Sequence, residues 1–313
     1  MRIEAQTVLD RYQIRKSKAQ KQAFRTYLHS VAQQQGYTTT EERGALGATN
    51  LIVGSPDTAK VVYTAHYDTC AALPFPNFIT PKNFLLYLLY QLLITVFLIL
   101  PGAIAAGIAV GIGVLCSVDS DWIALAAVLL FYVLLLATTA MIIAGPANKS
   151  TVNDNTSGVL TLIEIMCALQ EEQRDHVAFV FFDLEEAGLF GSSGFYSRHK
   201  KAMQHKLLVN FDCVSDGEHM LFAVRKRAKQ YVPALEQAFP TTAEVQSLVC
   251  TRGVFYPSDQ ASFPCGVGVA ALKYSRILRV LYLDRIHTKR DTVCREPNIE
   301  YLTAGAVHLV DLL

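Results

Sequence analysis

The sequence predicts an α/β fold, in which a mixed and mostly parallel sheet carries helices on both faces and is interrupted by a transmembrane helical hairpin. Short apolar runs alternate with longer segments of helical periodicity, a pattern typical of parallel strands that are buried on both faces. Each candidate strand ends in polar, metal-capable residues. Two uncharged stretches are each long enough to cross the roughly 30 Å hydrocarbon core, which takes about 20 helical residues.

The first 50 residues predict a helix followed by Gly and Thr punctuation, because Phe24, Tyr27, Leu28 and Val31 recur at helical spacing. A buried strand is then predicted in "KVVYTAHYD", with Lys60 at its solvated edge.

After the apolar stretches the pattern alternates again. Capping residues open an amphipathic helix in "NDNTSGVLTLIEIMCALQEE", and "HVAFVFFDLEEAGLFGSSGFYSRHKKA" predicts a strand, a turn and a helix. Further strands are predicted in "KLLVNFDCVSDG" and "GVGVAAL", and the closing segment "NIEYLTAGAVHLVDLL" predicts a helix.

The overall charge argues against nucleic-acid binding. A net charge of +1 over 313 residues provides no broad basic field for phosphate groups.

The seven cysteines show no CxxC spacing, and the first 20 residues lack the apolar core of a signal peptide. We therefore expect reduced thiols on the cytosolic side of a membrane.

Metal-ligating side chains occur where the loops of such a sheet converge, beyond the carboxyl ends of its strands. Five segments supply them: His66, Asp154, Glu186, Asp212 and His287. Imidazole and carboxylate together suit zinc, and one carboxylate can bridge two ions about 3.5 to 4 Å apart. Taken singly, each of these residues also fits a turn or a helix cap.

Together and in this order, the segments resemble a known family. "AHYDT", "NDNTSG", "FFDLEEAGLFGS", "NFDCV" and "IHTKRDT" are similar to the successive motifs of the M28 zinc peptidases, of the co-catalytic, two-zinc aminopeptidase type. The resemblance covers roughly residues 50 to 70 and 147 to 313. It implies an aminopeptidase-like fold and two zinc ions per chain.

The resemblance also implies a set of metal ligands. Asp154 would bridge the two zinc ions, His287 and Glu186 would complete one site, and His66 and Asp212 would complete the other.

Two further residues receive catalytic roles from the resemblance. Glu185 would be the general base and then the general acid, and Asp68 would accept a hydrogen bond from the far nitrogen of His66. The segment "SDQASF" resembles a loop near the active site of the family, so Ser258 and Asp259 are weaker pocket candidates, for which a structural role is preferred.

The implied function is that of a membrane-anchored zinc metallo-aminopeptidase, which removes N-terminal residues from peptides by attack of metal-activated water. A glutaminyl cyclase is one alternative, because that family shares the fold and similar "HYD" and "EEA" segments. A peptidase-like binding protein without activity is another, although such relatives typically lose ligands and all five are present here.

The apolar block lies between His66 and Asp154, so it is an insertion within the catalytic domain. Three apolar pieces are visible: Phe84–Leu100, Gly102–Val118 and Ile123–Gly145. Because His66 and Asp154 must lie on one side of the bilayer to share a site, an even number of crossings is required. We expect two helices, the first with a possible kink at the proline between the first two pieces.

These considerations divide the chain into residues 1–82 and 147–313, which form the catalytic domain, and 83–146, which form the hairpin. Lys82 and Lys149 flank the domain side of the hairpin, whereas its turn carries Asp119 and Asp121. The positive-inside tendency therefore predicts a two-pass protein with a cytoplasmic catalytic domain. The hairpin leaves from the rim that holds the metals, so we expect hydrophobic or membrane-derived peptides as substrates.

Overall fold

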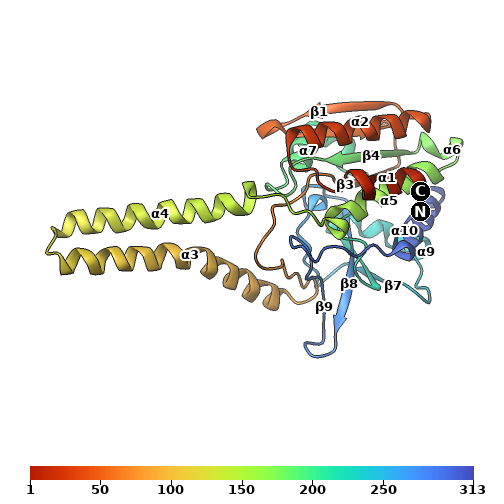
Figure 1. Cartoon of the computed structure of the whole chain (residues 1–313). Helices are drawn as coiled ribbons and strands as arrows, with labels where there is room; N and C mark the ends of the chain where they lie inside the picture. Colours follow the sequence, from red (N-terminus) through yellow and green to blue (C-terminus); the bar gives the residue numbers. More distant parts are fainter.

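Nine strands form one mixed sheet in the computed structural model, which describes residues 1–313 (Figure 1). The strands are β1 (Thr39–Arg43), β2 (Thr49–Val53), β3 (Val61–His66), β4 (Val177–Phe182), β5 (Leu207–Phe211), β6 (His219–Val224), β7 (Gln246–Cys250), β8 (Gly266–Ser275) and β9 (Val280–Tyr282). Their order is β1-β2-β4-β3-β5-β8-β6-β7, with β9 paired to β8. The central strands β4, β3, β5 and β8 run parallel, as the sequence predicts.

The central strands are buried on both faces because their side chains alternate between two apolar layers. In β3 and β4, Tyr63 and Phe179 belong to the larger hydrophobic cluster, and Val62 and Ala178 belong to a smaller one on the opposite face. Residues of α5 and α10 complete the larger cluster, whereas α7 and α8 contribute to the smaller one.

The helices of the body are α1 (Ile3–Arg11), α2 (Lys18–Gln34), α5 (Ser157–Ala168), α6 (Glu171–Arg174), α7 (Phe190–Arg198), α8 (Lys200–Met203), α9 (Val232–Ala238) and α10 (Glu296–Leu312). A capping box of Ser17 and Gln20 fixes the start of α2, because each side chain accepts a backbone N–H of the first turn. The predicted fold class, with helices on both faces of the sheet, is confirmed.

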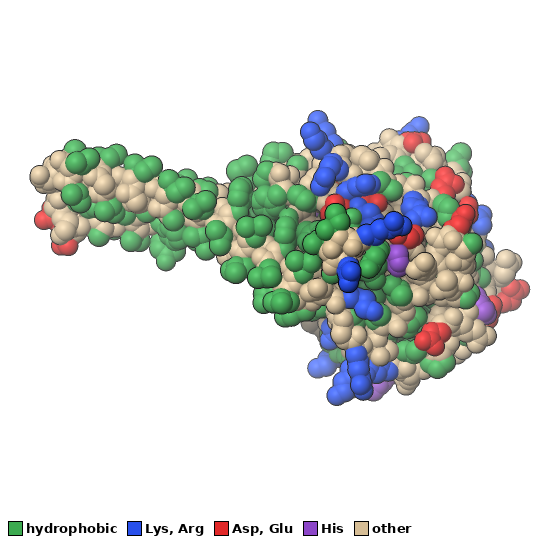
Figure 2. Space-filling model, turned by 90° about the horizontal axis from the view of Figure 1, so that it is seen from below, with side chains coloured by type: hydrophobic (Ala, Val, Ile, Leu, Met, Phe, Trp, Pro, Cys, Tyr) green, Lys and Arg blue, Asp and Glu red, His purple; other side chains and the backbone are tan.

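Two long apolar helices form an arm that projects from this body (Figure 1): α3 (Phe84–Leu115) and α4 (Ser120–Ala144). Pro101 lies inside α3, which continues through it, so the arm has two helices rather than three. Both helices are long and apolar enough to span a membrane. Large apolar side chains cover the surface of the arm (Figure 2), and Leu136, for example, is 68% exposed.

The chain leaves the body and returns to it at neighbouring positions. Ala71, before the arm, forms an isolated β-bridge with Ala147, after it. The arm is therefore attached beside the loop that follows His66. The division of the chain at residues 82 and 146 stays a prediction.

Candidate functional site

The sheet topology brings the predicted site residues to one place. His66 is the last residue of β3, Glu186 lies in the loop after β4, and Asp212 directly follows β5. Asp154 lies in a short distorted turn (Val152–Thr156) that leads into α5, and His287 lies in the loop after β9. Because β3, β4 and β5 are parallel neighbours, their carboxyl ends present these side chains at one edge of the sheet.

The distances divide these residues into two groups that meet at Asp154. His66 Nε2 lies 3.3 Å from Asp154 Oδ1 and 3.6 Å from Asp212 Oδ1. His287 Nε2 lies 3.0 Å from Asp154 Oδ2 and 3.3 Å from Glu186 Oε2. Each carboxylate oxygen of Asp154 therefore faces a different histidine.

The donors of both groups fit zinc. They are imidazole nitrogens and carboxylate oxygens, which are usual zinc ligands. His66, Asp154 and Asp212 could hold a metal ion together, since their ligand atoms lie within 4.8 Å of one another. Glu186 Oε1 is buried and has no hydrogen-bond partner in the protein, as expected of an oxygen that faces a cation.

The electrostatics of the metal-free protein show how strongly this cluster attracts positive charge. Burial by itself lowers the pKa of His66, but the charge of Glu185 and a hydrogen bond with Asp154 raise it well above its ordinary value. The pKa of His287 is also raised, to about 9, because Glu186 and Asp154 outweigh its burial. Burial raises the pKa of Glu186 to about 8. In the metal-free protein, the raised pKa values therefore favour the protonated forms of side chains that are also suited to bind metal cations.

Glu185 lies beside the two groups and lines the same cavity. Its carboxylate is within 4.8 Å of ligand atoms of His66 and Glu186. Burial raises its pKa well above the ordinary value, and the neighbouring Asp259 and Glu186 charges add to the effect. Burial therefore favours the protonated form of this carboxyl group.

Asp68 has different partners from those expected. Its carboxylate accepts hydrogen bonds from the backbone N–H groups of Glu185 (3.1 Å) and Glu186 (3.2 Å). His66 Nδ1 lies 3.6 Å from the Asp68 carboxylate, too far for a direct hydrogen bond, and 3.1 Å from the Asp68 carbonyl oxygen. Asp68 therefore positions the loop that carries the two glutamates.

Asn155, which is not among the predicted site residues, connects its own turn to the loops after β3 and β5, and its Nδ2 donates to the carbonyl of His66 at 3.4 Å. Its Nδ2 donates to the carbonyl of Phe211 (3.0 Å), and its Oδ1 accepts from the N–H groups of Cys213 (3.2 Å) and Gly158 (3.0 Å). The position directly after Asp154 in "NDNTSG" is the only signal in the sequence.

Asp291 and Arg15 were also missed. Asp291 accepts hydrogen bonds from the N–H groups of Asn153 (2.6 Å) and Asp154 (3.0 Å), and so holds the turn that carries Asp154. Arg15 is fully buried, and its Nη1 donates to Thr156 Oγ1 at 3.1 Å. Burial lowers the pKa of Arg15 to about 10, so it still carries its charge near neutral pH.

The backbone is left-handed at four non-glycine residues of these loops: Leu184, Leu189, Cys213 and His287, with φ of 55°, 61°, 59° and 63°. Such conformations cost on the order of 1 to 3 kcal/mol each and tend to cluster at functional sites. His287, one of the predicted metal ligands, has this left-handed backbone conformation.

A cavity of about 290 Å³ opens over the two groups. Besides the site residues, its wall contains Asn77, Ile79, Leu189, Tyr256 and Ile286. The cavity is concave and partly apolar, as is usual for small-molecule and peptide-end sites.

Of the two weaker candidates, neither lines this cavity. Ser258 is buried and accepts a hydrogen bond from Asn210 Nδ2 at 2.9 Å. Asp259 is fully buried, its carboxylate oxygens lack hydrogen-bond partners, and burial raises its pKa to about 7.

Comparisons with known proteins identify a matching family. The model of peptidase family M28 matches residues 138–308. A comparison with curated proteins finds no match.

Three solved structures share the fold at low sequence identity. Legionella pneumophila LapA aminopeptidase is 13% identical, with a TM-score of 0.54, over 98% of this chain and 69% of that one. A leucine aminopeptidase precursor from Bacteroides thetaiotaomicron is 13% identical, with a TM-score of 0.54, over 98% of this chain and 95% of that one. Porphyromonas gingivalis glutaminyl cyclase is 15% identical, with a TM-score of 0.55, over 99% of this chain and 97% of that one.

Proposed function

The chain belongs to peptidase family M28, and from this we propose that it is a membrane-anchored, two-zinc aminopeptidase. Family and fold support a peptidase-like hydrolase with a metal site. The number of zinc ions, the preference for N-terminal residues and the membrane anchor are the proposed parts.

The observation that carries the proposal is the position of Asp154 between two ligand groups. His287 and Glu186 would hold one zinc ion, His66 and Asp212 would hold the other, and Asp154 would offer one oxygen to each. Zinc bound there would supply a Lewis acid that polarises the peptide carbonyl and lowers the pKa of water.

Glu185 would move the proton in this reaction. Its carboxylate lies within the cavity, next to both groups, where it can take a proton from the attacking water. The same carboxyl group can then give the proton to the leaving amine. Asp68 contributes by fixing the backbone of Glu185 through a hydrogen bond.

The proposed preference for a peptide terminus is supported by the family and by the fold shared with aminopeptidases. A free terminal amine can also ligate a metal ion, which would explain selection of the N-terminus.

This proposal is tested with the purified full-length chain and matched peptides that carry a free or an acetylated N-terminus. We expect stepwise release of single residues from the free peptide, followed by mass spectrometry, and none from the acetylated one. Cleavage at internal bonds, or release from the C-terminus, would contradict it.

Glutaminyl cyclase is the second candidate function, because a glutaminyl cyclase shares the fold. The same experiment separates the two functions when one peptide begins with glutamine. Loss of ammonia without shortening of the peptide would indicate the cyclase. A folded protein that binds metal and leaves all peptides unchanged would indicate a binding protein.

The anchor is proposed from α3 and α4. Exposed apolar surface on this scale is unusual for a soluble monomer but expected of helices in lipid. Acidic side chains lie at the far end of the arm (Figure 2), where Asp119 and Asp121 precede and begin α4. Lys82 and Lys149 are exposed at the body end. This asymmetry favours a cytoplasmic body.

The orientation is tested by replacing Asp119 with cysteine, in a background in which the nearby Cys116 is replaced by serine. We expect a membrane-impermeant maleimide to label this cysteine in intact cells. Labelling only after the cells are lysed would contradict the proposed orientation.

The substrates are proposed to be hydrophobic or membrane-derived peptides, because both sides of the cavity contact α3. On one side, Phe78 packs on Tyr90 with ring centroids 5.4 Å apart, next to Asn77 and Ile79 of the cavity wall. On the other side, Phe255 packs on Phe84 at 5.4 Å and precedes Tyr256. The opening is therefore held against the start of a helix proposed to enter the bilayer.

Two peptides with the same first three residues, one with an apolar tail and one with a polar tail, test this idea. In lipid nanodiscs we expect a higher kcat/KM for the apolar tail, and we expect the difference to shrink in detergent. Equal rates in nanodiscs would remove the proposed substrate class and leave the aminopeptidase proposal unaffected.

A further inference from the structure

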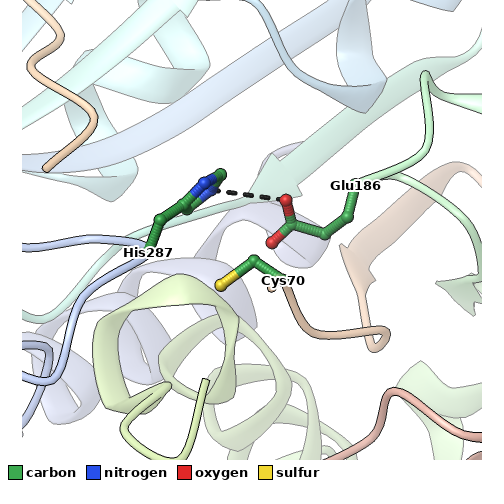
Figure 3. A group of neighbouring side chains, drawn as sticks. All are labelled: Cys70, Glu186 and His287. Atoms are coloured by element: carbon green, nitrogen blue, oxygen red, sulfur yellow. Dashed lines mark ion pairs between the residues drawn. The ribbon is translucent and has the colours of Figure 1, made fainter. Parts of the chain in front are cut away.

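A cysteine lies beside one of the two ligand groups. Cys70 Sγ, a carboxylate oxygen of Glu186 and a ring nitrogen of His287 all lie within 4.8 Å of one another (Figure 3). The three residues come from three different loops of the site, and Cys70 follows His66 by four positions. No role in the proposed hydrolysis uses this thiol.

Packing does not account for Cys70. Buried cysteines usually behave as small apolar side chains, and Cys265 does so here, since it belongs to the larger hydrophobic cluster. Cys70 is only 3% exposed but belongs to none of the three clusters. Its thiol is buried against polar ligand atoms instead.

The backbone around Cys70 is fixed from both sides. Its carbonyl oxygen accepts a hydrogen bond from the Asn148 N–H at 3.1 Å, and the next residue, Ala71, forms the bridge with Ala147. Before it, Thr69 Oγ1 accepts a hydrogen bond from the N–H of Arg15 at 3.0 Å. The direction of the thiol is therefore set by the fold and not by a mobile loop.

Resting on the proposed metal centre, we propose that Cys70 is an additional ligand of the zinc ion held by Glu186, His287 and Asp154. Ligand atoms of a zinc ion lie about 2.0 to 2.3 Å from the metal, and so about 3 to 4 Å from each other. Glu186 Oε2 and His287 Nε2 lie 3.3 Å apart, and Cys70 Sγ lies within 4.8 Å of the ligand atoms of both residues. These atoms would need to move only slightly closer together to bind one zinc ion. The thiol would lose its proton to solvent when it binds the metal.

The added ligand makes the two metal positions chemically different. The group around His287 would have oxygen, nitrogen and sulfur donors, whereas the group around His66 has only oxygen and nitrogen. A soft thiolate favours zinc over manganese or magnesium. We therefore expect the position next to Cys70 to bind zinc more tightly and more selectively than the other.

Cobalt replaces zinc in such sites and reports sulfur ligands by an intense near-ultraviolet charge-transfer band. The full-length protein in detergent is stripped of metal and titrated with Co²⁺. We expect this band to appear with the first cobalt equivalent and to be absent from the Cys70→Ser and Cys70→Ala variants. X-ray absorption of the zinc-loaded protein should show a zinc–sulfur distance of about 2.3 Å.

Cys213 provides a matched control, because its sulfur lies 3.1 Å from Asp212 Oδ1 but it belongs to no group of converging ligand atoms. Cys213→Ala should keep the band. In Cys70→Ser the zinc affinity of one position should fall by about 10- to 100-fold or more, the range known for loss of even an outer-shell partner.

Three outcomes would overturn the inference. Bound cobalt without a sulfur band in the parent protein would show that Cys70 is not a ligand and would leave the two-metal proposal intact. An unchanged band in a folded Cys70→Ala variant would do the same. Failure of the parent protein to bind cobalt at all would overturn the metal centre itself, and the Cys70 inference with it.

Discussion

Glu185 is the side chain on which the proposed reaction depends most. It lies in the cavity, close to both ligand groups, and burial raises its pKa well above the ordinary value. Its backbone N–H is held by Asp68. We therefore propose that the two residues act as one unit, in which Asp68 positions Glu185 and Glu185 transfers the proton.

Glu185→Gln should lower kcat by about 10²- to 10⁴-fold, the usual contribution of a general base. The amide has nearly the same shape as the carboxyl group but cannot accept the proton. Metal content, measured on the same preparation, should stay at the parent value. The exposed Glu236→Gln is the matched control. Parent activity in Glu185→Gln would remove Glu185 from the mechanism.

Asn155→Ala should destabilise the protein by at least about 1 to 3 kcal/mol, because it leaves the buried carbonyl of Phe211 and the N–H of Cys213 without partners. Zinc affinity should fall as well, since the loops of Asp154 and Asp212 lose their common link. Urea unfolding and metal titration measure the two effects. A variant with parent stability and affinity would show that these loops are held by other contacts.

The residues with recognisable chemistry could be located from the sequence, and the residues that support them could not. His66, Asp154 and His287 stand out as imidazole and carboxylate at strand ends or in family-like segments, and the structure brings them together. Arg15 lies in the segment "QIRKSKAQ", whose polar composition is typical of a solvent-exposed surface. Only the tertiary fold shows that its side chain is fully buried next to the site.

Among the elements, the strands at the centre of the sheet could be predicted from the local sequence, whereas a strand at its edge could not. β3, β4 and β5 are buried along their whole length, so their apolar runs predict strands directly. β1 has the polar sequence "TTEER" and is a strand because β2 pairs with it in an antiparallel register. Such edge strands depend on their partner, which the local sequence does not reveal.

The arm is stabilised by close contact between α3 and α4 at glycine. A Cβ atom at Gly102 would lie 2.9 Å from the Phe131 carbonyl oxygen, whereas nothing lies within 4 Å of the same position at Gly107. Small residues that allow close backbone approach are typical of helix pairs in membranes.

Gly102→Val should therefore destabilise the arm by about 1 to 3 kcal/mol, the usual cost of overpacking. Gly107→Val in the same helix is the matched control and should have little effect on folding. The thermal midpoint of each variant in lipid nanodiscs measures the difference. Equal midpoints would show that α3 and α4 are not packed through this contact.

For the whole molecule, the buried cluster of candidate metal ligands couples stability to pH. In the metal-free protein, the pKa values of His287 and Glu186 rise to about 9 and about 8, above their ordinary values. The folded state therefore holds protons that the unfolded chain releases. This contribution is present at low pH and is lost as the pH rises from about 5 to about 9.

The thermal midpoint of the EDTA-treated protein should consequently be lower at pH 9 than at pH 6. Zinc takes the place of these protons, so the stabilisation by added zinc should grow over the same interval. Scanning calorimetry with and without zinc measures both trends. A metal-free midpoint that rises with pH would contradict the proposed charge balance.

The arm and the metal centre are joined at one rim of the body, because the chain enters and leaves the arm beside the loop of Cys70. The molecule can thus be described as one hydrolytic site with a proposed membrane anchor at its edge. We propose that Asp154 divides the site into two metal positions, and that these act together on a peptide terminus.

The most direct test is to measure zinc per chain in the purified full-length protein while following digestion of a peptide library by mass spectrometry. The account predicts two zinc ions per chain and loss of single residues from free N-termini. One zinc ion per chain at saturation, together with cyclisation of N-terminal glutamine and no shortening of peptides, would contradict it.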